Sequence, residues 1–196
     1  MRSDWGDQEI GNARKNLIAE EPVEKLSWPY ARRGDGYPTV NVLFVCEDNS
    51  ALSIMAESIL NSVAPGRFGA YSAGCYPNEW LNAYAVEFLA QHRMPLASSR
   101  AKSLDHFRRA GAPCMDFIIT LCDVAADAHF AGWPGDPFVA HWHVETDDAT
   151  GDADDVLRDN FWTLMRRIKI FASLPHGKLN RRVLERRALT LQASYL

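Results

Sequence analysis

The sequence has no apolar run that approaches the roughly 20 residues of a transmembrane helix, and its first residues lack the apolar centre of a secretory signal peptide. It has only four cysteines, which are too few and too widely spaced for a disulfide scaffold. It also has no repeat and no low-complexity tract, and its 12 glycines and 10 prolines among 196 residues are ordinary for a globular chain. These absences exclude collagen-like, coiled-coil and fully disordered proteins, and they favour a cytoplasmic protein without a membrane partner.

The chain also lacks an excess of charge that would recruit a polyanion. Its 21 basic and 25 acidic residues give a net charge of −4, so neither nucleic acid nor an anionic membrane is favoured as a partner. The charged residues of 143–159 are mostly acidic, and those of 160–196 are mostly basic. Residues 176–196 form a separate C-terminal segment. In it, the run from Lys178 to Arg187 predicts a basic amphipathic helix. This helix either contacts nucleic acid or an acidic partner, or is solvated or faces a second copy in a homodimer, and we favour the second interpretation.

Two parts of the chain differ in character. Residues 1–38 are polar and irregular and end in a break that contains glycine and proline. We expect them to form an N-terminal extension that packs loosely or becomes ordered against a protein partner. Residues 39–175 instead alternate between short apolar runs and amphipathic stretches, which predicts one folded domain.

The alternation predicts strands over 40–45, 67–73, 115–122 and 138–142. It also predicts one helix that ends near residue 63 and three further helices over 78–91, 103–110 and 152–173. Strands that alternate with helices predict an α/β fold, a single domain with a four-stranded parallel sheet flanked by helices on both faces. In such sheets ligands bind beyond the carboxyl ends of the strands. The loops after Val45, Cys122 and Trp142 are therefore the candidate site.

The loop after the first strand is the most informative segment. Cys46 ends a buried strand and is followed by a short polar loop and the start of a helix. Inward-pointing amides and the positive end of the helix dipole would lower the pKa of a thiol placed there, and they would also hold an oxyanion. The alternative is that Cys46 is an ordinary small residue of the core.

Several collinear segments resemble the low-molecular-weight protein tyrosine phosphatases and the related arsenate reductases, whose signature is C-x5-R-[ST] after the first strand. The matching segments are Asn49–Ala51, Ser53–Glu57, Tyr71–Gly74, Arg100–Ser103, Met115–Asp123, Trp133–Gly135 and Ala140–Trp142. The last two look closer to the bacterial arsenate-reductase-like branch. The resemblance runs from about residue 39 to 174, and it implies the fold expected above.

The resemblance also implies roles for residues of this sequence. Cys46 matches the nucleophile that attacks phosphate or arsenate, Ser53 the hydroxyl that stabilises its thiolate, and Asn49 the residue that braces the loop. The substrate would be a phosphate- or arsenate-like anion held by the anion loop, whose members after Cys46 are Glu47, Asp48, Asn49, Ser50, Ala51, Leu52 and Ser53. The general acid would be an aspartate after the last strand. Direct alignment places Thr146 at that position, and a one-residue shift places Asp147 there, with Asp148 beside it. The alternative is that these residues form a solvated acidic loop.

The anion loop departs from the family signature at the arginine position, which is Leu52. Arginine supplies bidentate hydrogen bonds and a fixed positive charge to the transition state. Glu47 and Asp48 add two possible negative charges to the same loop. The sequence therefore predicts a pseudo-enzyme that uses the old cleft for binding, and the alternative is an active cysteine-dependent phosphatase or arsenate reductase.

The cysteine relay of the thioredoxin-coupled arsenate reductases is also incomplete. Cys122 matches the second thiol of that relay, but His129 and Phe130 stand where the third thiol is expected. An external thiol could replace it, or Cys122 could be structural. Cys75 and Cys114 lie outside the motif positions, and we interpret them as packing residues.

A metal site is the last alternative. If the three loops converge, ligand-type residues surround one cleft: Cys46, Glu47, Asp48, His129, His143 and Asp147. However, their spacing matches no metal motif, and His141 is explained by the family resemblance. The sequence therefore predicts neither a metal nor another cofactor.

Overall fold

The computed structural model describes residues 39–144, 152–173 and 181–193. The predicted extension over 1–38 lies outside these residues. The strands are β1 (Val40–Cys46), β2 (Phe68–Gly74), β3 (Phe117–Thr120) and β4 (Phe138–His141). The helices are α2 (Leu52–Val63), α3 (Ala83–Gln91), α4 (Leu104–Arg108), α5 (Asp123–Ala126), α6 (Ala153–Ala172) and α7 (Arg181–Ala193).

The four strands form one parallel sheet in the order β2-β1-β3-β4, which confirms the predicted α/β fold. Along β1 successive side chains point to opposite faces of the sheet. Val42 and Phe44 belong to one apolar cluster, and Leu43 and Val45 belong to a second cluster on the other face. Both faces of the strand are apolar because both are covered by helices.

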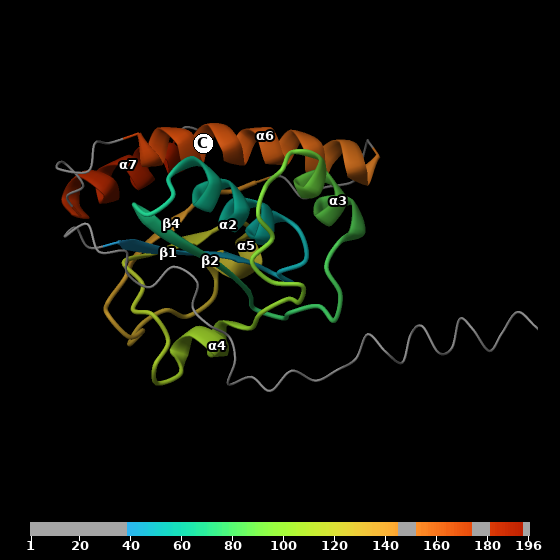
Figure 1. Cartoon of the computed structure of the whole chain (residues 1–196). Helices are drawn as coiled ribbons and strands as arrows, with labels where there is room; N and C mark the ends of the chain where they lie inside the picture. The colour runs from blue at the N-terminus through green and yellow to red at the C-terminus, as the bar shows by residue number, and fades with distance from the viewer. Residues whose placement is uncertain (1–38, 145–151, 174–180, 194–196) are drawn as a thin grey trace, which may run out of the picture.

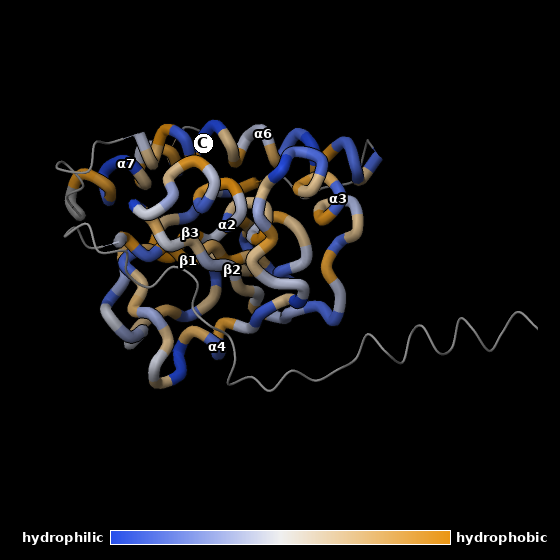
Figure 2. The backbone as a smooth tube through the Cα atoms, viewed as in Figure 1, coloured by the Kyte–Doolittle hydropathy of each residue, from blue (hydrophilic) through white to orange (hydrophobic). Residues whose placement is uncertain are grey.

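Helices cover the two faces unequally (Figure 1). The larger cluster lies under α2, α3, α6 and α7, and its aromatic centre includes Trp142, Phe161 and Phe171. The smaller cluster lies under α4 and α5 and includes Leu104 and Phe107. In Figure 2 the central strands are largely apolar, whereas α6 carries polar residues along its outer side.

The helix expected to start at Asn78 starts four residues later. Asn82 is the N-cap residue of α3, because its side chain accepts a hydrogen bond from the Ala85 amide at 3.0 Å. The Asn78 amide instead donates to the Asp48 carbonyl at 2.8 Å. The residues before α3 are therefore used to hold the loop after β1.

The basic C-terminal helix packs on the domain along one side. In α7 the apolar residues Leu184, Ala188 and Leu191 are buried in the larger cluster. The indole of Trp142 donates to the Ala188 carbonyl at 3.0 Å, which ties α7 to the end of β4. None of the helices in the described part of the chain is long and apolar enough to cross a membrane.

Candidate functional site

The loop between β1 and α2 occupies the point where the strand order reverses. β1 pairs with β2 on one side and with β3 on the other, so the connection from β1 to β2 runs to one side and the connection from β2 to β3 crosses back over to the other. Crevices at such a switch point are the usual ligand sites of parallel α/β sheets. This position makes residues 46–53 the first candidate for chemistry.

Asn49 holds the loop in its unusual shape. Its φ is 54°, in the left-handed region that asparagine adopts more readily than most residues. The fully buried side chain donates from Nδ2 to the Ser53 hydroxyl at 2.8 Å and accepts the Lys102 amide at Oδ1 at 2.6 Å. Asn49 thus connects the loop to the first turn of α2 and to the segment before α4.

The Cys46 sulfur lies inside this network. Its Sγ is 2.9 Å from the Ser53 hydroxyl and accepts the Asn49 amide at 3.2 Å. Because the Ser53 oxygen already accepts from Asn49, its own proton is available to donate to the sulfur. The three residues match the arrangement that the family resemblance implied.

The pKa of the Cys46 thiol nevertheless lies well above its ordinary value. Burial raises this pKa to about 11, and the hydrogen bond from Ser53 opposes the rise only in part. The negative charge of Asp48 also raises it. The sequence-based expectation of a lowered pKa is therefore wrong, because the cost of burying a thiolate exceeds the help from the loop amides.

Asp48 turns its carboxylate back onto the loop. Its Oδ1 accepts the Ser50 amide at 3.0 Å, its Oδ2 accepts the Ser50 hydroxyl at 2.6 Å, and Oδ1 lies 3.8 Å from the Cys46 sulfur. This is the local turn that aspartate commonly forms with the residue two positions later. As a result, the Asp48 carboxylate is bound to the Ser50 amide and lies beside the Cys46 sulfur.

Two amides of the loop are engaged by internal acceptors. The Asn49 amide donates to the Cys46 sulfur and the Ser50 amide to Asp48. Two of the groups that could hold the oxygens of an incoming anion therefore already have partners within the protein.

Leu52, at the arginine position, begins α2 and turns into the core. Its side chain is 7% exposed and belongs to the larger apolar cluster. It contributes no hydrogen-bond donor and no charge to the loop. With leucine in place of arginine, an anion in the loop would depend on backbone amides and on the positive end of α2.

Gly74 allows the loop to sit against β2. A Cβ atom at this position would lie 2.8 Å from the Asp48 carbonyl carbon and 2.9 Å from the Asn49 nitrogen. The chain that follows braces the loop with hydrogen bonds to its carbonyls at 2.7 to 3.1 Å, whose donors are the amides of Cys75, Tyr76, Asn78 and Asn82. The loop is therefore fixed from both sides.

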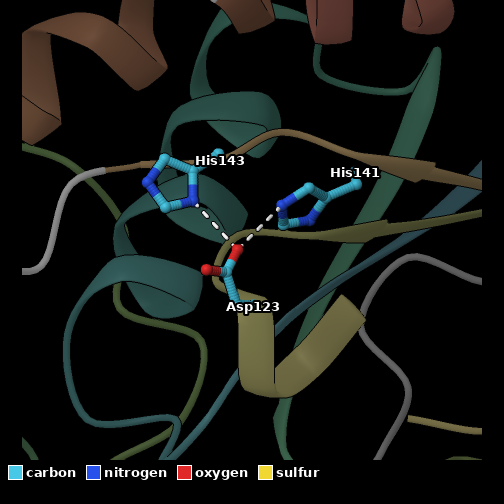
Figure 3. A group of neighbouring side chains, drawn as sticks. All are labelled: Asp123, His141 and His143. Atoms are coloured by element: carbon cyan, nitrogen blue, oxygen red, sulfur yellow. Dashed lines mark hydrogen bonds and ion pairs between the residues drawn. The ribbon is translucent and has the colours of Figure 1, made fainter. Parts of the chain in front are cut away.

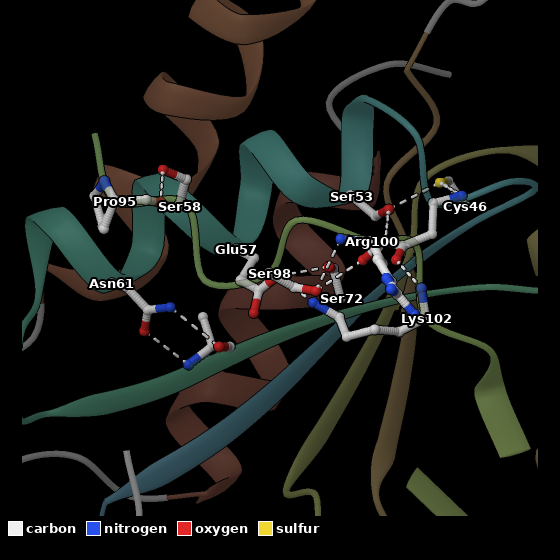
Figure 4. Close-up of polar contacts among 12 residues, drawn as sticks. Cys46, Ser53, Glu57, Ser58, Asn61, Ser72, Pro95, Ser98, Arg100 and Lys102 are labelled. Carbon is white, nitrogen blue, oxygen red and sulfur yellow. Dashed lines mark hydrogen bonds and ion pairs between the residues drawn. The ribbon is translucent and has the colours of Figure 1, made fainter. Parts of the chain in front are cut away.

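A buried ion pair, shown in Figure 4, lies behind the anion loop. The Lys102 ammonium is 2.9 Å from Glu57 Oε2, which also accepts the Ser72 hydroxyl at 2.5 Å. Glu57 and Lys102 lie in segments that resemble the family, but the sequence alone assigned them no role. The signal that could have found them is a pair of opposite charges in two otherwise apolar, motif-bearing segments.

The other three cysteines differ in their surroundings. Cys122 is buried at the N-cap of α5, and burial raises its pKa. Cys75 is half-buried against the smaller cluster, and its pKa is raised by burial and by Cys122. Cys114 is exposed, so the interpretation as a packing residue is wrong for it.

The metal ligands considered from the sequence do not assemble in the described residues, and Asp147, Thr146 and Asp148 lie outside them. His129 is exposed and contributes no side chain to the Cys46 loop. His143 does meet other ligand-type side chains, namely His141 and Asp123. Asp123 was not predicted as a ligand from the sequence, because its contact with the two histidines depends on how the strands align.

Comparisons with known proteins agree with this architecture. Residues 41–132 match the family model described as low molecular weight phosphotyrosine protein phosphatase. An arsenate reductase from Archaeoglobus fulgidus is 26% identical with a TM-score of 0.54, and the match covers 68% of this chain and 99% of that one. A low molecular weight protein tyrosine phosphatase from T. tengcongensis is 25% identical with a TM-score of 0.54, covering 69% of this chain and 100% of that one.

A thioredoxin-dependent arsenate reductase from Corynebacterium glutamicum shares the fold. It is 23% identical with a TM-score of 0.51, and the match covers 80% of this chain and 69% of that one. A comparison with the curated proteins finds no match.

Proposed function

The chain belongs to the low-molecular-weight phosphotyrosine protein phosphatase family, which its residues 41–132 match, and on that premise we propose that it is a phosphatase-like binding protein without phosphatase activity. Its anion loop is closed to phosphate, and the surface around the loop serves to bind a protein partner. The proposal depends on what occupies the loop beside Cys46.

The position of the Asp48 carboxylate carries the proposal. It accepts the Ser50 amide at 3.0 Å and lies 3.8 Å from the sulfur that would attack phosphorus. A phosphate dianion that approached this sulfur would meet a fixed negative charge and an amide already in use. In the absence of a compensating cation, the repulsion opposes both binding and the further charge of the transition state.

The replacement of arginine by Leu52 supports the same conclusion. The leucine side chain is buried in the core, so its position adds no donor to the loop. The Lys102 ammonium does not substitute for the arginine, because it pairs with Glu57 at 2.9 Å. With a thiol pKa of about 11, on the order of one Cys46 in 10⁴ is a thiolate at pH 7.

A binding surface is available at the rim of the loop. The bracing segment, residues 75–82, carries Tyr76 and Trp80 with side chains 72% and 63% exposed. Large aromatic side chains are the commonest anchors of protein interfaces. We therefore assign the binding role to this rim and expect a partner that offers an apolar surface, without a phosphate group, to Tyr76 and Trp80.

The test compares phosphate chemistry in the wild type with that of a repaired loop. Hydrolysis of para-nitrophenyl phosphate and calorimetric binding of orthovanadate are measured for the wild type, Leu52→Arg and Asp48→Asn/Leu52→Arg. Loss of one oxyanion donor costs on the order of 10²–10³ in rate in other enzymes. We expect no vanadate binding by the wild type, and binding together with at least about 10²-fold more turnover in the double variant.

Two controls make the comparison specific. Glu47→Gln removes a neighbouring charge without changing the internal acceptors of the loop, so it should not restore binding. Cys46→Ser removes the candidate nucleophile. Wild-type turnover that disappears in Cys46→Ser would overturn the proposal.

An active enzyme is the second candidate, and one observation favours it. The contacts among Cys46, Ser53 and Asn49 are intact, at 2.8 to 3.2 Å. If the chain reduces arsenate, an external thiol must complete the reaction, and Cys122→Ser should abolish it. No arsenate reduction with glutathione or thioredoxin as donor would exclude this candidate.

A further inference from the structure

Three ligand-type side chains converge at the edge of the sheet where β4 ends (Figure 3). Asp123 Oδ1 lies 3.5 Å from His141 Nε2 and 3.2 Å from His143 Nδ1. Both imidazoles thus face the same carboxylate oxygen. All three ligand atoms lie within 4.8 Å of one another.

The sheet itself produces this convergence. Thr120, the last residue of β3, pairs with His141, the last residue of β4. Asp123 follows β3 at the start of α5, and His143 follows β4 on the same side of the strand as His141. Residues about 20 positions apart in the sequence are therefore placed side by side by the backbone.

The spacing suits a transition metal ion. Zinc binds imidazole nitrogen at about 2.0–2.1 Å and carboxylate oxygen at about 2.0–2.2 Å, so two ligands of a tetrahedral site lie roughly 3.4 Å apart. The two nitrogen–oxygen distances here, 3.5 and 3.2 Å, bracket that value. Two imidazoles with one carboxylate are a donor set typical of zinc and of ferrous iron, whereas magnesium and calcium prefer oxygen alone.

Thr120 orients the histidine. Its hydroxyl is 2.9 Å from His141 Nδ1 and also lies within 3.5 Å of the Ala140 carbonyl, to which it can donate. In that arrangement Nδ1 carries the imidazole proton, and the lone pair of Nε2 faces the Asp123 oxygen. A hydrogen bond to the distal nitrogen is the usual support of a metal-binding histidine.

We propose that Asp123, His141 and His143 form a binding site for a divalent transition metal ion, and we take Zn²⁺ as the reference ion. His141 binds through Nε2, His143 through Nδ1 and Asp123 through Oδ1. Three protein ligands leave at least one coordination position for water or an anionic oxygen ligand. This site is separate from the Cys46 loop, and its existence does not depend on whether that loop binds phosphate.

The experiment uses the purified full chain, treated with a chelator and kept reduced. Binding of Zn²⁺ is measured by calorimetry, and binding of Co²⁺ by its visible spectrum. We expect one equivalent to bind, with no sulfur-to-cobalt charge-transfer band. Because even an outer hydrogen-bond partner is worth 10–100-fold in metal affinity, Asp123→Asn and His143→Gln should each weaken binding by at least about 100-fold.

Matched variants separate a built site from general histidine binding. His129→Gln removes an exposed histidine outside the group and should leave the affinity unchanged. Thr120→Val should weaken binding about 10–100-fold, and Thr120→Ser should restore it, since only the hydroxyl is needed. Absence of binding, equal affinity in Asp123→Asn and the wild type, or a cobalt spectrum with thiolate bands would each overturn the proposal.

Discussion

Replacing Asp48 by asparagine tests whether this carboxylate suppresses the reactivity of Cys46. The substitution keeps an oxygen that can accept the Ser50 amide but removes the negative charge 3.8 Å from the sulfur. Two unit charges at this separation interact by about 1 kcal/mol in water and about 4 kcal/mol at an effective dielectric constant of 20. Because Asp48 is half-buried and accessible to water, the lower end applies.

An energy near this lower limit corresponds to a fall of about one unit in the thiol pKa, from about 11 to about 10, and to about tenfold more thiolate at pH 8. The intrinsic reactivity of a thiolate falls as its pKa falls, with a Brønsted coefficient of about 0.4–0.5, which removes roughly threefold. We therefore expect Cys46 in Asp48→Asn to react with a small disulfide about threefold faster than in the wild type at pH 8.

The assay follows the mixed disulfide at Cys46 by peptide mass spectrometry between pH 7 and 10.5, which separates it from the other three cysteines. Glu47→Gln is the matched control, since its charge is not among the causes that raise the pKa of Cys46. Equal rates and equal pH profiles for Asp48→Asn and the wild type would refute the assignment of Asp48 as a suppressing charge.

Two further substitutions test the supports of the loop. Gly74→Ala places a Cβ atom 2.8 Å from the Asp48 carbonyl carbon. Urea denaturation should therefore show a loss of about 1–3 kcal/mol in the free energy of unfolding. An unchanged midpoint of denaturation would contradict this close packing. Glu57→Gln leaves the buried Lys102 ammonium without its counter-charge and should lower the free energy of unfolding by about 3–5 kcal/mol. The double variant Glu57→Gln/Lys102→Met should lose less stability than the single variant. A larger loss in the double variant would argue against the ion pair.

The sequence predicted the central strands of the sheet well because they are buried on both faces. The runs around Val42 and Phe117 are continuous and apolar, which is typical of central parallel strands. The helix start at Asn78 was wrong by four residues because two asparagines compete for the cap. Asn82 caps α3, while Asn78 bonds to the loop after β1. Only the tertiary structure distinguishes them.

The candidate site was harder to predict than the fold. Local sequence placed Cys46 between the end of a strand and the start of a helix, and this position alone would lower its pKa. The opposing effect, burial, depends on how the loop packs against β2 and the segment after it. The group of Asp123, His141 and His143 depends on the register between β3 and β4, which a single sequence does not specify.

The anion loop and the proposed metal site lie at the same edge of the sheet, but the loop concerns an anion and the metal site a cation. Cys46 ends β1 and His141 ends β4, and the intervening β3 places these strand axes about 10 Å apart. At that distance a divalent cation and the Asp48 carboxylate attract by less than about 1 kcal/mol in water, and physiological salt screens most of it. A metal ion bound at the histidines would therefore not neutralise the charge that closes the anion loop. Opening that loop requires a change within it, at Asp48 or Leu52, whether or not the metal site is filled.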